Sequence, residues 1–304
     1  MNLLRWVVSG EELWHWRNAA QKAAIAAKVS PRELDWLLQE VAGLERLTLH
    51  LESFRNLPQI PLRLDIKDLD RLWQRRLEER LPVQYIAGVV FWRNFKLAVS
   101  PAVLIPRPET EQIIDLAVMA AKNNPSVFID RGHWVDLGTG SGAIAIALAQ
   151  VFPLAKIHAV DCSAQAMAIA VANAQSLGFG DRIEFYQGSW WQPLERYKGK
   201  LSAMVSNPPY IPSASVAQLQ PEVAHHEPKL ALDGGDDGLD CLRYLVETGP
   251  DYLQPGGIWL VEMMAGQAEV VASLLQSHPS YTNISIYPDL AGIERFVLAL
   301  LKNS

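Results

Sequence analysis

The sequence predicts an α/β protein in which a helical module precedes a mostly parallel sheet. Three observations support this prediction. Residues 1–80 contain mainly helical patterns, and from about residue 109 short apolar strands alternate with helices. One of those strands runs into a glycine-rich turn that opens a helix, in "VDLGTGSGAIAIALA". Alternation of this kind gives a parallel sheet with helices on both faces.

The first 80 residues predict three clear helices. "SGEELWHWRNAAQKAAIAA" opens with Ser9 as an N-cap and acidic residues in its first turn. "SPRELDWLLQEVAGL" opens with Ser30 as the cap and Pro31 at the first helical position. "DIKDLDRLWQRRLEERL" is the third helix. We expect residues 1–80 to form a helical bundle domain.

Residues 81–105 change character. "GVVFW" and "FKLAVS" flank Arg93-Asn94, which predicts a β-hairpin with Asn94 at positive φ. The proline-rich "PAVLIPRPET" follows. We expect a hairpin linker at 81–105 and a second domain at 106–304.

The second domain is predicted to contain a parallel sheet with one antiparallel edge. The expected strands are "HWVDL", "AKIHAVD", "RIEFYQG", "LSAMVSN" and "GGIWLVEM". The closing stretch "NISIYPDLAGIERFVLALL" predicts two strands with little between them. A close pair of this kind is antiparallel, at the edge of the sheet.

Composition narrows the class of protein. The chain has 304 residues, 49% of them hydrophobic, and a net charge of −6, which argues against a protein that grips nucleic acid over a wide surface. Cys162 and Cys241 have no metal-ligand spacing and indicate two reduced cysteines rather than a disulfide framework or a metal site. No apolar run reaches the roughly 18 residues of a membrane span, and no signal peptide is expected. We expect a cytoplasmic protein.

The glycine turn indicates a nucleoside cofactor. Gly138, Gly140 and Gly142 let the backbone turn sharply and approach a ligand at the carboxyl end of a strand. The spacing also fits the looser dinucleotide pattern. Asp136 lies two residues before the first glycine, a poor place for a carboxylate beside a pyrophosphate but a suitable one for an ammonium group, such as that of S-adenosylmethionine. Asp161, which ends the next strand, suits a ribose diol in either cofactor.

A second loop, "SNPPYI", follows the fourth predicted strand of this domain and lies on the same edge of the sheet. Pro208 and Pro209 have fixed φ and no N–H, and Asn207 is driven to an extended conformation by the proline after it. The loop is therefore a stiff arch with an amide oxygen, the Pro208 carbonyl and the flat ring of Tyr210. Such a site suits a planar –NH₂ group on a conjugated carbon, which it activates mainly by alignment.

In order along residues 82–298, the stretches "FWRNFKLAVSPAVLIPRPETE", "VDLGTGSGAIAIALA", "VSNPPYI", "HHEPKLALDGGDDGLD" and "DLAGIERF" resemble the release-factor glutamine methyltransferase family, HemK/PrmC. The resemblance implies a seven-strand Rossmann-like S-adenosylmethionine-dependent methyltransferase domain with an N-terminal helical bundle domain. It implies methylation of the glutamine amide nitrogen in the Gly-Gly-Gln motif of class 1 peptide release factors, and we expect a monomer.

Carried over by position, the resemblance also implies site residues. The cofactor contacts would be Gly138, Thr139, Gly140, Ser141, Gly142, Asp161, Trp190 and Asn207, with Trp190 along the adenine or, equally, one more core aromatic. Asn207, Pro208, Pro209 and Tyr210 would hold the glutamine amide.

Several residues stay without an assigned role. Ser189 stands where many relatives have an acid, and "VEMMAGQ" departs from the usual pattern, so Glu262 receives no role. The pair Arg107 and Glu109 suits either site orientation or a domain-interface ion pair. His225 and His226 are expected to be solvated, and "DGGDDGLD" does not match a calcium loop.

Three other functions remain open. A DNA adenine methyltransferase uses a similar proline loop, but the acidic charge and the lack of a target-recognition insert count against it. A methyltransferase of another protein's glutamine is a nearer alternative. A non-catalytic nucleotide-binding module of translation complexes is the third, although an intact Asn207 beside the glycine turn speaks against it.

Overall fold

The computed structural model describes residues 6–124 and 129–303 of the chain. The chain divides into two compact units. The N-terminal unit comprises Met1–Val90 together with Gln220–His226, and the second comprises Phe91–Leu219 and Glu227–Ser304. A short segment from the middle of the chain therefore belongs with the N-terminal helices.

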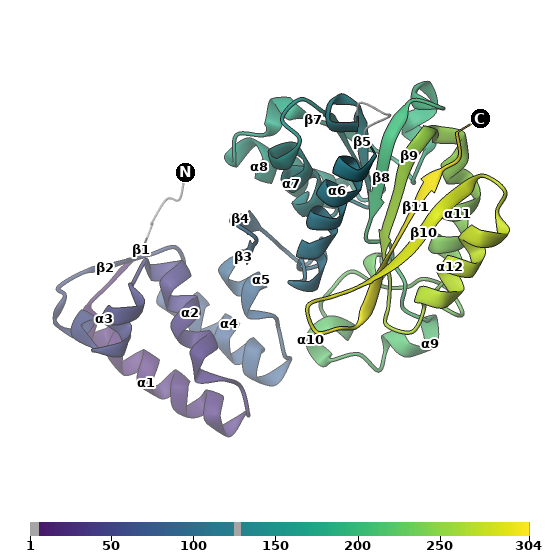
Figure 1. The fold of residues 1–304 in the computed structure, drawn as a ribbon. Helices are drawn as coiled ribbons and strands as arrows, with labels where there is room; N and C mark the ends of the chain where they lie inside the picture. Colours follow the sequence, from purple (N-terminus) through teal and green to yellow (C-terminus); the bar gives the residue numbers. More distant parts are fainter. Residues whose placement is uncertain (1–5, 125–128, 304) are drawn as a thin grey trace. The chain divides into compact units, whose positions relative to one another are not determined.

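The N-terminal unit is helical, as predicted (Figure 1). Ser9, Ser30 and Asp65 each accept a backbone N–H from the first turn of a long helix, so the two serine caps read from the sequence are confirmed. A two-stranded antiparallel sheet, which the sequence did not indicate, joins β1 to β2. The elements are β1 (Trp6–Val8), α1 (Gly10–Ala26), α2 (Pro31–Ala42), α3 (Arg46–His50), β2 (Ile60–Leu62), α4 (Ile66–Glu78), α5 (Val83–Ala87) and α10 (Pro221–Ala224).

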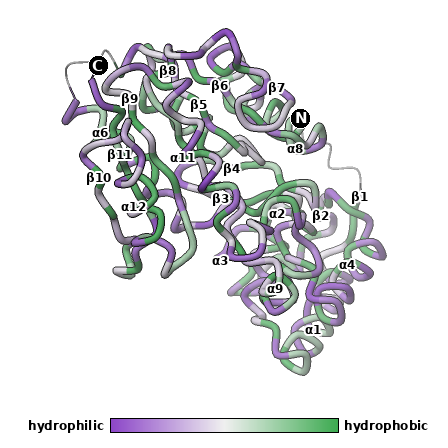
Figure 2. Tube along the Cα trace, turned by 90° about the vertical axis from the view of Figure 1, so that its right-hand side faces the viewer, coloured by the Kyte–Doolittle hydropathy of each residue, from purple (hydrophilic) through white to green (hydrophobic). Residues whose placement is uncertain are grey.

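This unit has its own core and its own buried ion pairs. Leucines on α2 and Trp73 on α4 are fully buried in one cluster, and Figure 2 shows hydrophobic and hydrophilic stretches alternating along α1 and α4. Arg76 on α4 is only 7% exposed and binds Glu33 at 2.8 Å and Glu222 of α10 at 2.8 Å. His226 has a ring nitrogen 2.7 Å from the Glu79 carbonyl. Both histidines lie in a turn, as expected for loop residues; His225 is exposed, and His226 is partly exposed with this one backbone contact.

The second unit contains a seven-stranded sheet in the order β10-β11-β9-β8-β5-β6-β7. The five strands from β9 to β7 are parallel to one another, and β11 and β10 are antiparallel at one edge, as predicted. The strands are β5 (His133–Leu137), β6 (Lys156–Asp161), β7 (Ile183–Gln187), β8 (Leu201–Ser206), β9 (Leu253–Glu262), β10 (Tyr281–Pro288) and β11 (Glu294–Leu301).

Helices cover both faces of this sheet, so every residue of β8 and most residues of β5 and β9 are buried. Figure 1 shows α6, α7 and α8 on one side and α11 and α12 on the other. The second face packs Leu242, Leu245, Val271 and Leu275 against the strands. The helices are α6 (Gln112–Asn123), α7 (Ala143–Val151), α8 (Ala164–Ser176), α9 (Ser213–Val216), α11 (Asp240–Tyr252) and α12 (Ala268–Ser277). The fold class predicted from the sequence is confirmed.

The predicted hairpin is present as β3 (Val89–Trp92) and β4 (Phe95–Ala98), but its turn differs from the prediction. The positive φ, 51°, falls at Arg93 and not at Asn94. The Arg93 N–H donates to Glu111 Oε1 at 2.7 Å, and its guanidinium donates to the Glu111 carbonyl and to Asp115. These bonds from the start of α6 compensate for the strained backbone.

The compact units do not coincide with the divisions expected from sequence, since residues 81–90 and 220–226 belong to the N-terminal unit. The functional division into a substrate-docking domain at 1–80, a linker at 81–105 and a methyltransferase domain at 106–304 stays a prediction. None of the helices in the described residues has the length and apolar character needed to cross a membrane.

Candidate active site

The glycine turn follows β5 and opens α7. Gly138, Gly140 and Gly142 have φ of 77°, 54° and 84°, a region that other residues rarely adopt. A Cβ on Gly138 or Gly140 would meet no heavy atom within 4 Å, whereas one on Gly142 would lie 3.2 Å from Ala170 of α8. The first two glycines therefore face open space, and the third allows two helices to pack closely.

Asp136, the last but one residue of β5, lies beneath this turn with no exposed surface. Its Oδ2 accepts the Thr139 hydroxyl at 2.6 Å and the Ala145 N–H at 3.1 Å, while Oδ1 has no hydrogen-bond partner among the described residues. Burial raises the pKa of Asp136 to about 7. The carboxyl thus joins the glycine turn to α7. Its predicted contact with a cofactor ammonium group stays a prediction.

Asp161 ends β6 beside the same turn. Its Oδ2 accepts the Gly140 N–H at 2.9 Å, and its Oδ1 accepts the Ser163 N–H at 2.8 Å. Burial raises the pKa of this carboxyl, although the two N–H donors favour its charged form. Each carboxylate oxygen has a second lone pair, so the side chain keeps acceptor capacity toward the pocket that it lines.

The asparagine–proline loop leaves β8 at the same edge of the sheet. Asn207 Nδ2 donates to Thr110 Oγ1 at 3.3 Å. Pro208 is buried, and Pro209 reaches the pocket. Because the amide nitrogen of Asn207 donates to Thr110, the amide oxygen of the same side chain is left to accept a hydrogen bond from another group.

Two glycines explain the stretch "DGGDDGLD", whose role could not be predicted from the sequence. A Cβ on Gly234 would lie 2.8 Å from the Pro209 carbonyl oxygen, and one on Gly238 would lie 2.3 Å from the Tyr210 carbonyl oxygen. Gln267 Nε2 also donates to the Tyr210 carbonyl, at 3.0 Å. The stretch therefore packs directly against the backbone of the proline loop and holds its shape.

The Tyr210 side chain reaches a buried carboxyl at the end of β9. Its hydroxyl donates to Glu262 Oε1 at 3.2 Å, and Glu262 is 1% exposed. Burial raises the pKa of Glu262 to about 7, and the nearby Thr110 and Tyr210 hydroxyls oppose that rise. Burial also raises the pKa of Tyr210, so its hydroxyl remains protonated.

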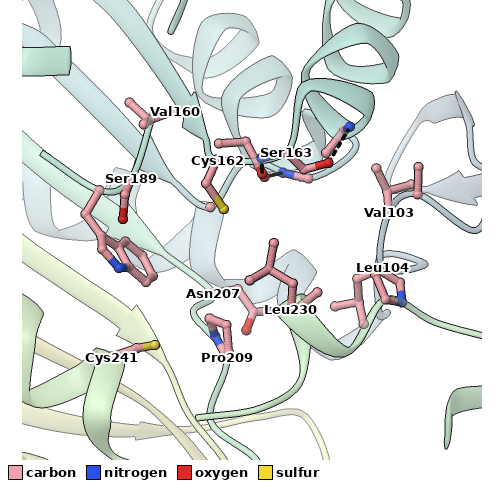
Figure 3. Close-up of a pocket in the computed structure, with 18 of the residues that line it drawn as sticks. Val103, Leu104, Val160, Cys162, Ser163, Ser189, Asn207, Pro209, Leu230 and Cys241 are labelled. Carbon is pink, nitrogen blue, oxygen red and sulfur yellow. Dashed lines mark hydrogen bonds between the residues drawn. The ribbon is translucent and has the colours of Figure 1, made fainter. Parts of the chain in front are cut away.

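A pocket of about 260 Å³ lies between the glycine turn and the proline loop (Figure 3). Its predicted residues come from four strand ends: Gly138, Gly140, Asp161, Trp190, Asn207 and Pro209. The other six predicted residues, Asp136, Thr139, Ser141, Gly142, Pro208 and Tyr210, are not among those that line it.

The pocket also has walls that sequence reasoning missed. Ala102, Val103 and Leu104 come from the stretch expected to be a linker, and Leu230 follows the N-terminal unit's inserted segment. Figure 3 shows Cys162 and Cys241 at the same pocket. Burial raises the pKa of Cys241 to about 11, so this thiol is neutral. Two motifs of the resemblance contain some of these residues: "PAVLIPRPET" contains Ala102, Val103 and Leu104, and "HHEPKLALDGGDDGLD" contains Leu230.

Trp190 lies at the pocket in a strained backbone conformation, with φ of 50°. Its ring is half-buried and 6.3 Å from that of Tyr244, while Ser189 beside it is exposed and also lines the pocket. The neighbouring Trp191, not Trp190, is the fully buried core aromatic. The contact between Trp190 and adenine stays a prediction.

Arg107 binds Glu227 at 2.7 Å, and both residues belong to the second unit. The Glu227 side chain is 1% exposed, and burial raises its pKa against the opposing effect of Arg107. The ion pair of Arg107 therefore lies within the second unit and joins the proline-rich stretch to the chain that returns from the inserted segment.

The residues present fit S-adenosylmethionine. Two glycines with positive φ open onto the pocket, a carboxyl with spare acceptor capacity ends the neighbouring strand, and a half-buried aromatic ring lines the same pocket. A seven-stranded sheet with an antiparallel edge and this site defines a Rossmann-like methyltransferase that uses S-adenosylmethionine.

Comparisons with known proteins support the assignment as a methyltransferase. The family described as "Methyltransferase small domain" matches residues 116–226. The release factor glutamine methyltransferase of Synechocystis sp. is 55% identical over 96% of this chain and 97% of its own length, and that of Thermosynechococcus vestitus is 48% identical over 96% and 99%. This chain belongs to the release factor glutamine methyltransferase family. The crystal structure of the hMettl16 catalytic domain, 13% identical, shares the fold with a TM-score of 0.53 over 81% of this chain and 86% of that one.

Proposed function

We propose that this enzyme methylates the side-chain amide nitrogen of the glutamine in the Gly-Gly-Gln motif of class 1 peptide release factors. The observation that carries the proposal is the Asn207 amide at the pocket wall, with its Nδ2 engaged by Thr110 and its backbone followed by two prolines. Relatives named for this reaction, similar over nearly the whole chain, support it.

In this proposal the proline loop aligns the substrate amide. Asn207 Oδ1 and the Pro208 carbonyl accept its two N–H bonds, and the Tyr210 ring packs on its face. Bound in the pocket, S-adenosylmethionine supplies an electrophilic methyl group. Two fixed acceptors orient the nitrogen lone pair and enrich it, and alignment of this kind supplies about 7–11 kcal/mol of a barrier in favourable cases. No general base is needed, because the nitrogen becomes acidic as it gains the methyl group.

The cofactor contacts are part of the same proposal. Gly138, Gly140 and the Asp161 carboxyl hold the nucleoside end, with Trp190 along the adenine. Thr139, Ser141 and Gly142 act on the cofactor through the shape of the turn, which the buried bond from Thr139 to Asp136 supports. Asp136 accepts from the ammonium group of the cofactor, and its Oδ1, which has no hydrogen-bond partner among the described residues, supports that role.

The docking of the protein substrate, the oligomeric state of the enzyme and its location in the cell are further proposals. The N-terminal helices dock the protein substrate, since a loop-tip glutamine offers little area and specific complexes bury about 1,200–2,000 Å² in total. The enzyme acts as a monomer in the cytoplasm, where release factors work, without direct contact with nucleic acid. The net charge of −6 supports the last point.

The decisive test offers a purified release factor and duplex DNA separately, each with S-adenosylmethionine carrying a labelled methyl group. We expect label on the release factor, and mass spectrometry of its peptides should locate one methyl group on the Gly-Gly-Gln glutamine. Label on DNA, on another residue or on neither substrate would contradict the proposal.

A further inference from the structure

We propose that Thr110 and Glu262 are positioning residues that orient the Asn207 amide, with its oxygen toward the substrate and its –NH₂ group away from it. This inference rests on the proposed function and adds two residues to the machinery. Neither residue lines the pocket, so both act through Asn207 or Tyr210.

The orientation of an asparagine amide is decided by its hydrogen-bond partners. An amide that turned by half a rotation would present –NH₂ to the substrate –NH₂, and two donors would face each other. In this structure Asn207 Nδ2 donates to Thr110 Oγ1 at 3.3 Å, so Thr110 acts as the acceptor that selects the useful orientation.

A threonine hydroxyl can serve as donor or acceptor, so something must select its role. Thr110 is buried, and its hydroxyl lies beside the Glu262 carboxyl and favours the charged form of that group. In its charged form, which Thr110, Tyr210 and Arg295 favour against burial, the Glu262 carboxyl only accepts, so it draws the one hydroxyl hydrogen and leaves a lone pair for Asn207. Glu262 therefore makes the Thr110 hydroxyl an acceptor for Asn207, and Thr110 in turn sets the orientation of the Asn207 amide.

Glu262 also controls the other end of the loop. Its Oε1 accepts the Tyr210 hydroxyl at 3.2 Å, and its Oε2 is buried without a close hydrogen-bond partner among the described residues. Arg295 favours the charged form of this carboxyl and Glu109 opposes it. A buried carboxyl that is not fully satisfied lowers stability relative to an apolar residue. Packing alone therefore does not explain a carboxyl that directly follows the apolar run Ile258–Val261 of β9.

Three variants test the inference in the full-length enzyme with a release factor as substrate. Thr110→Val keeps the shape and removes the hydroxyl, Thr110→Ser keeps the hydroxyl, and Glu262→Gln offers a donor where only an acceptor stood. We expect Thr110→Val to lower kcat by about 10²-fold, as small misplacements at a reacting centre do. Its KM for the release factor and its calorimetric affinity for S-adenosylmethionine should stay close to those of the parent.

Thr110→Ser should recover most of the rate, and Glu262→Gln should lower kcat in the same manner as Thr110→Val. Thr282→Val on β10 and Glu247→Gln on α11 make the matching changes away from the pocket and should leave kcat unchanged. Parent-like turnover by Thr110→Val, or equal loss in the Val and Ser variants, would overturn the inference.

A second measurement needs no methyl transfer. The side-chain amide protons of Asn207, observed by NMR in protein labelled at asparagine, should exchange slowly in the parent and in Thr110→Ser, and faster in Thr110→Val. Equal exchange rates in all three would also overturn the inference. If the parent methylates no release factor, the proposed function fails, while the exchange rates still decide whether Thr110 orients Asn207.

Discussion

The carboxyl group of Asp161 accepts the backbone N–H of Gly140 at 2.9 Å, which ties the end of β6 to the turn after β5. One side chain thereby holds the glycine turn in place and keeps acceptor capacity toward the pocket. Parallel strands bring their carboxyl ends to one edge of the sheet, so residues 21 positions apart meet there.

Asp161→Ala should weaken S-adenosylmethionine binding. The change removes the acceptor pair proposed for the ribose diol and frees the Gly140 N–H. The loss of hydrogen bonds to a charged group costs about 1.5–3 kcal/mol. Calorimetry on the folded variant measures it, with the exposed Asp181→Ala as a control outside the pocket. Undiminished affinity in Asp161→Ala would show that this carboxyl does not hold the cofactor.

Asn207→Ala should slow methyl transfer far more than it weakens cofactor binding. It removes one of two acceptors for the substrate amide, and loss of one positioned polar group costs about 2.7–4 kcal/mol, or 10²–10³ in rate. Asn207→Asp keeps an acceptor but adds a negative charge, so cofactor affinity should hold while turnover changes. Single-turnover methylation of a release factor with saturating cofactor is the measurement. A parent rate in Asn207→Ala would make the loop a structural strand exit only.

Arg76→Ala should destabilise the N-terminal unit. The change leaves Glu33 and Glu222 without the buried cation that binds both. Breaking a buried pair in this way costs about 3–5 kcal/mol, whereas the exposed Arg71→Ala on the same helix should cost under about 1 kcal/mol. Urea unfolding followed by tryptophan fluorescence compares the two. Equal midpoints for the two variants would contradict the prediction.

His158 should make the protein less stable in mild acid. Burial, with His133 nearby, lowers the pKa of His158 from 6.5 to about 4, and its ring nitrogen lies 2.8 Å from that of His133. As the pH falls from 6.5 toward 4, the unfolded chain binds a proton that the folded protein excludes, so the free energy of unfolding falls. For this single group the loss approaches about 3 kcal/mol at pH 4.

His158→Gln removes that loss and retains Asp136 and Glu262, whose raised pKa values act in the opposite sense between about pH 4.5 and 7. The free energy of unfolding of the parent, minus that of His158→Gln, should therefore decrease as the pH falls from 6.5 to 4. Urea titrations at several pH values measure that difference. A difference that stays constant with pH would refute the assignment to His158.

Local patterns were enough to predict much of the fold. Serine caps, apolar strands and the glycine spacing each reflect short-range physics, so the helix starts at Ser9 and Ser30 and the strands of the parallel sheet agree with the structure. The edge of the sheet that holds the site could also be predicted, because the carboxyl ends of parallel strands lie at the same edge. That rule predicts Gly138, Asp161 and Asn207 at one edge of the sheet, and the structure brings all three to one pocket.

Tertiary structure alone decided the contacts between residues far apart in the chain. Thr110 reaches Asn207 across 97 positions, Tyr210 reaches Glu262 across 52, and Arg76 reaches Glu222 across 146. No local propensity specifies such partners, because burial of the whole unit is what removes water and requires each polar group to find another. The same reason explains Arg93, whose positive φ depends on bonds to Glu111 and Asp115 rather than on its own preference. The sequence by itself therefore determined which loops meet, and packing determined which side chains hold them.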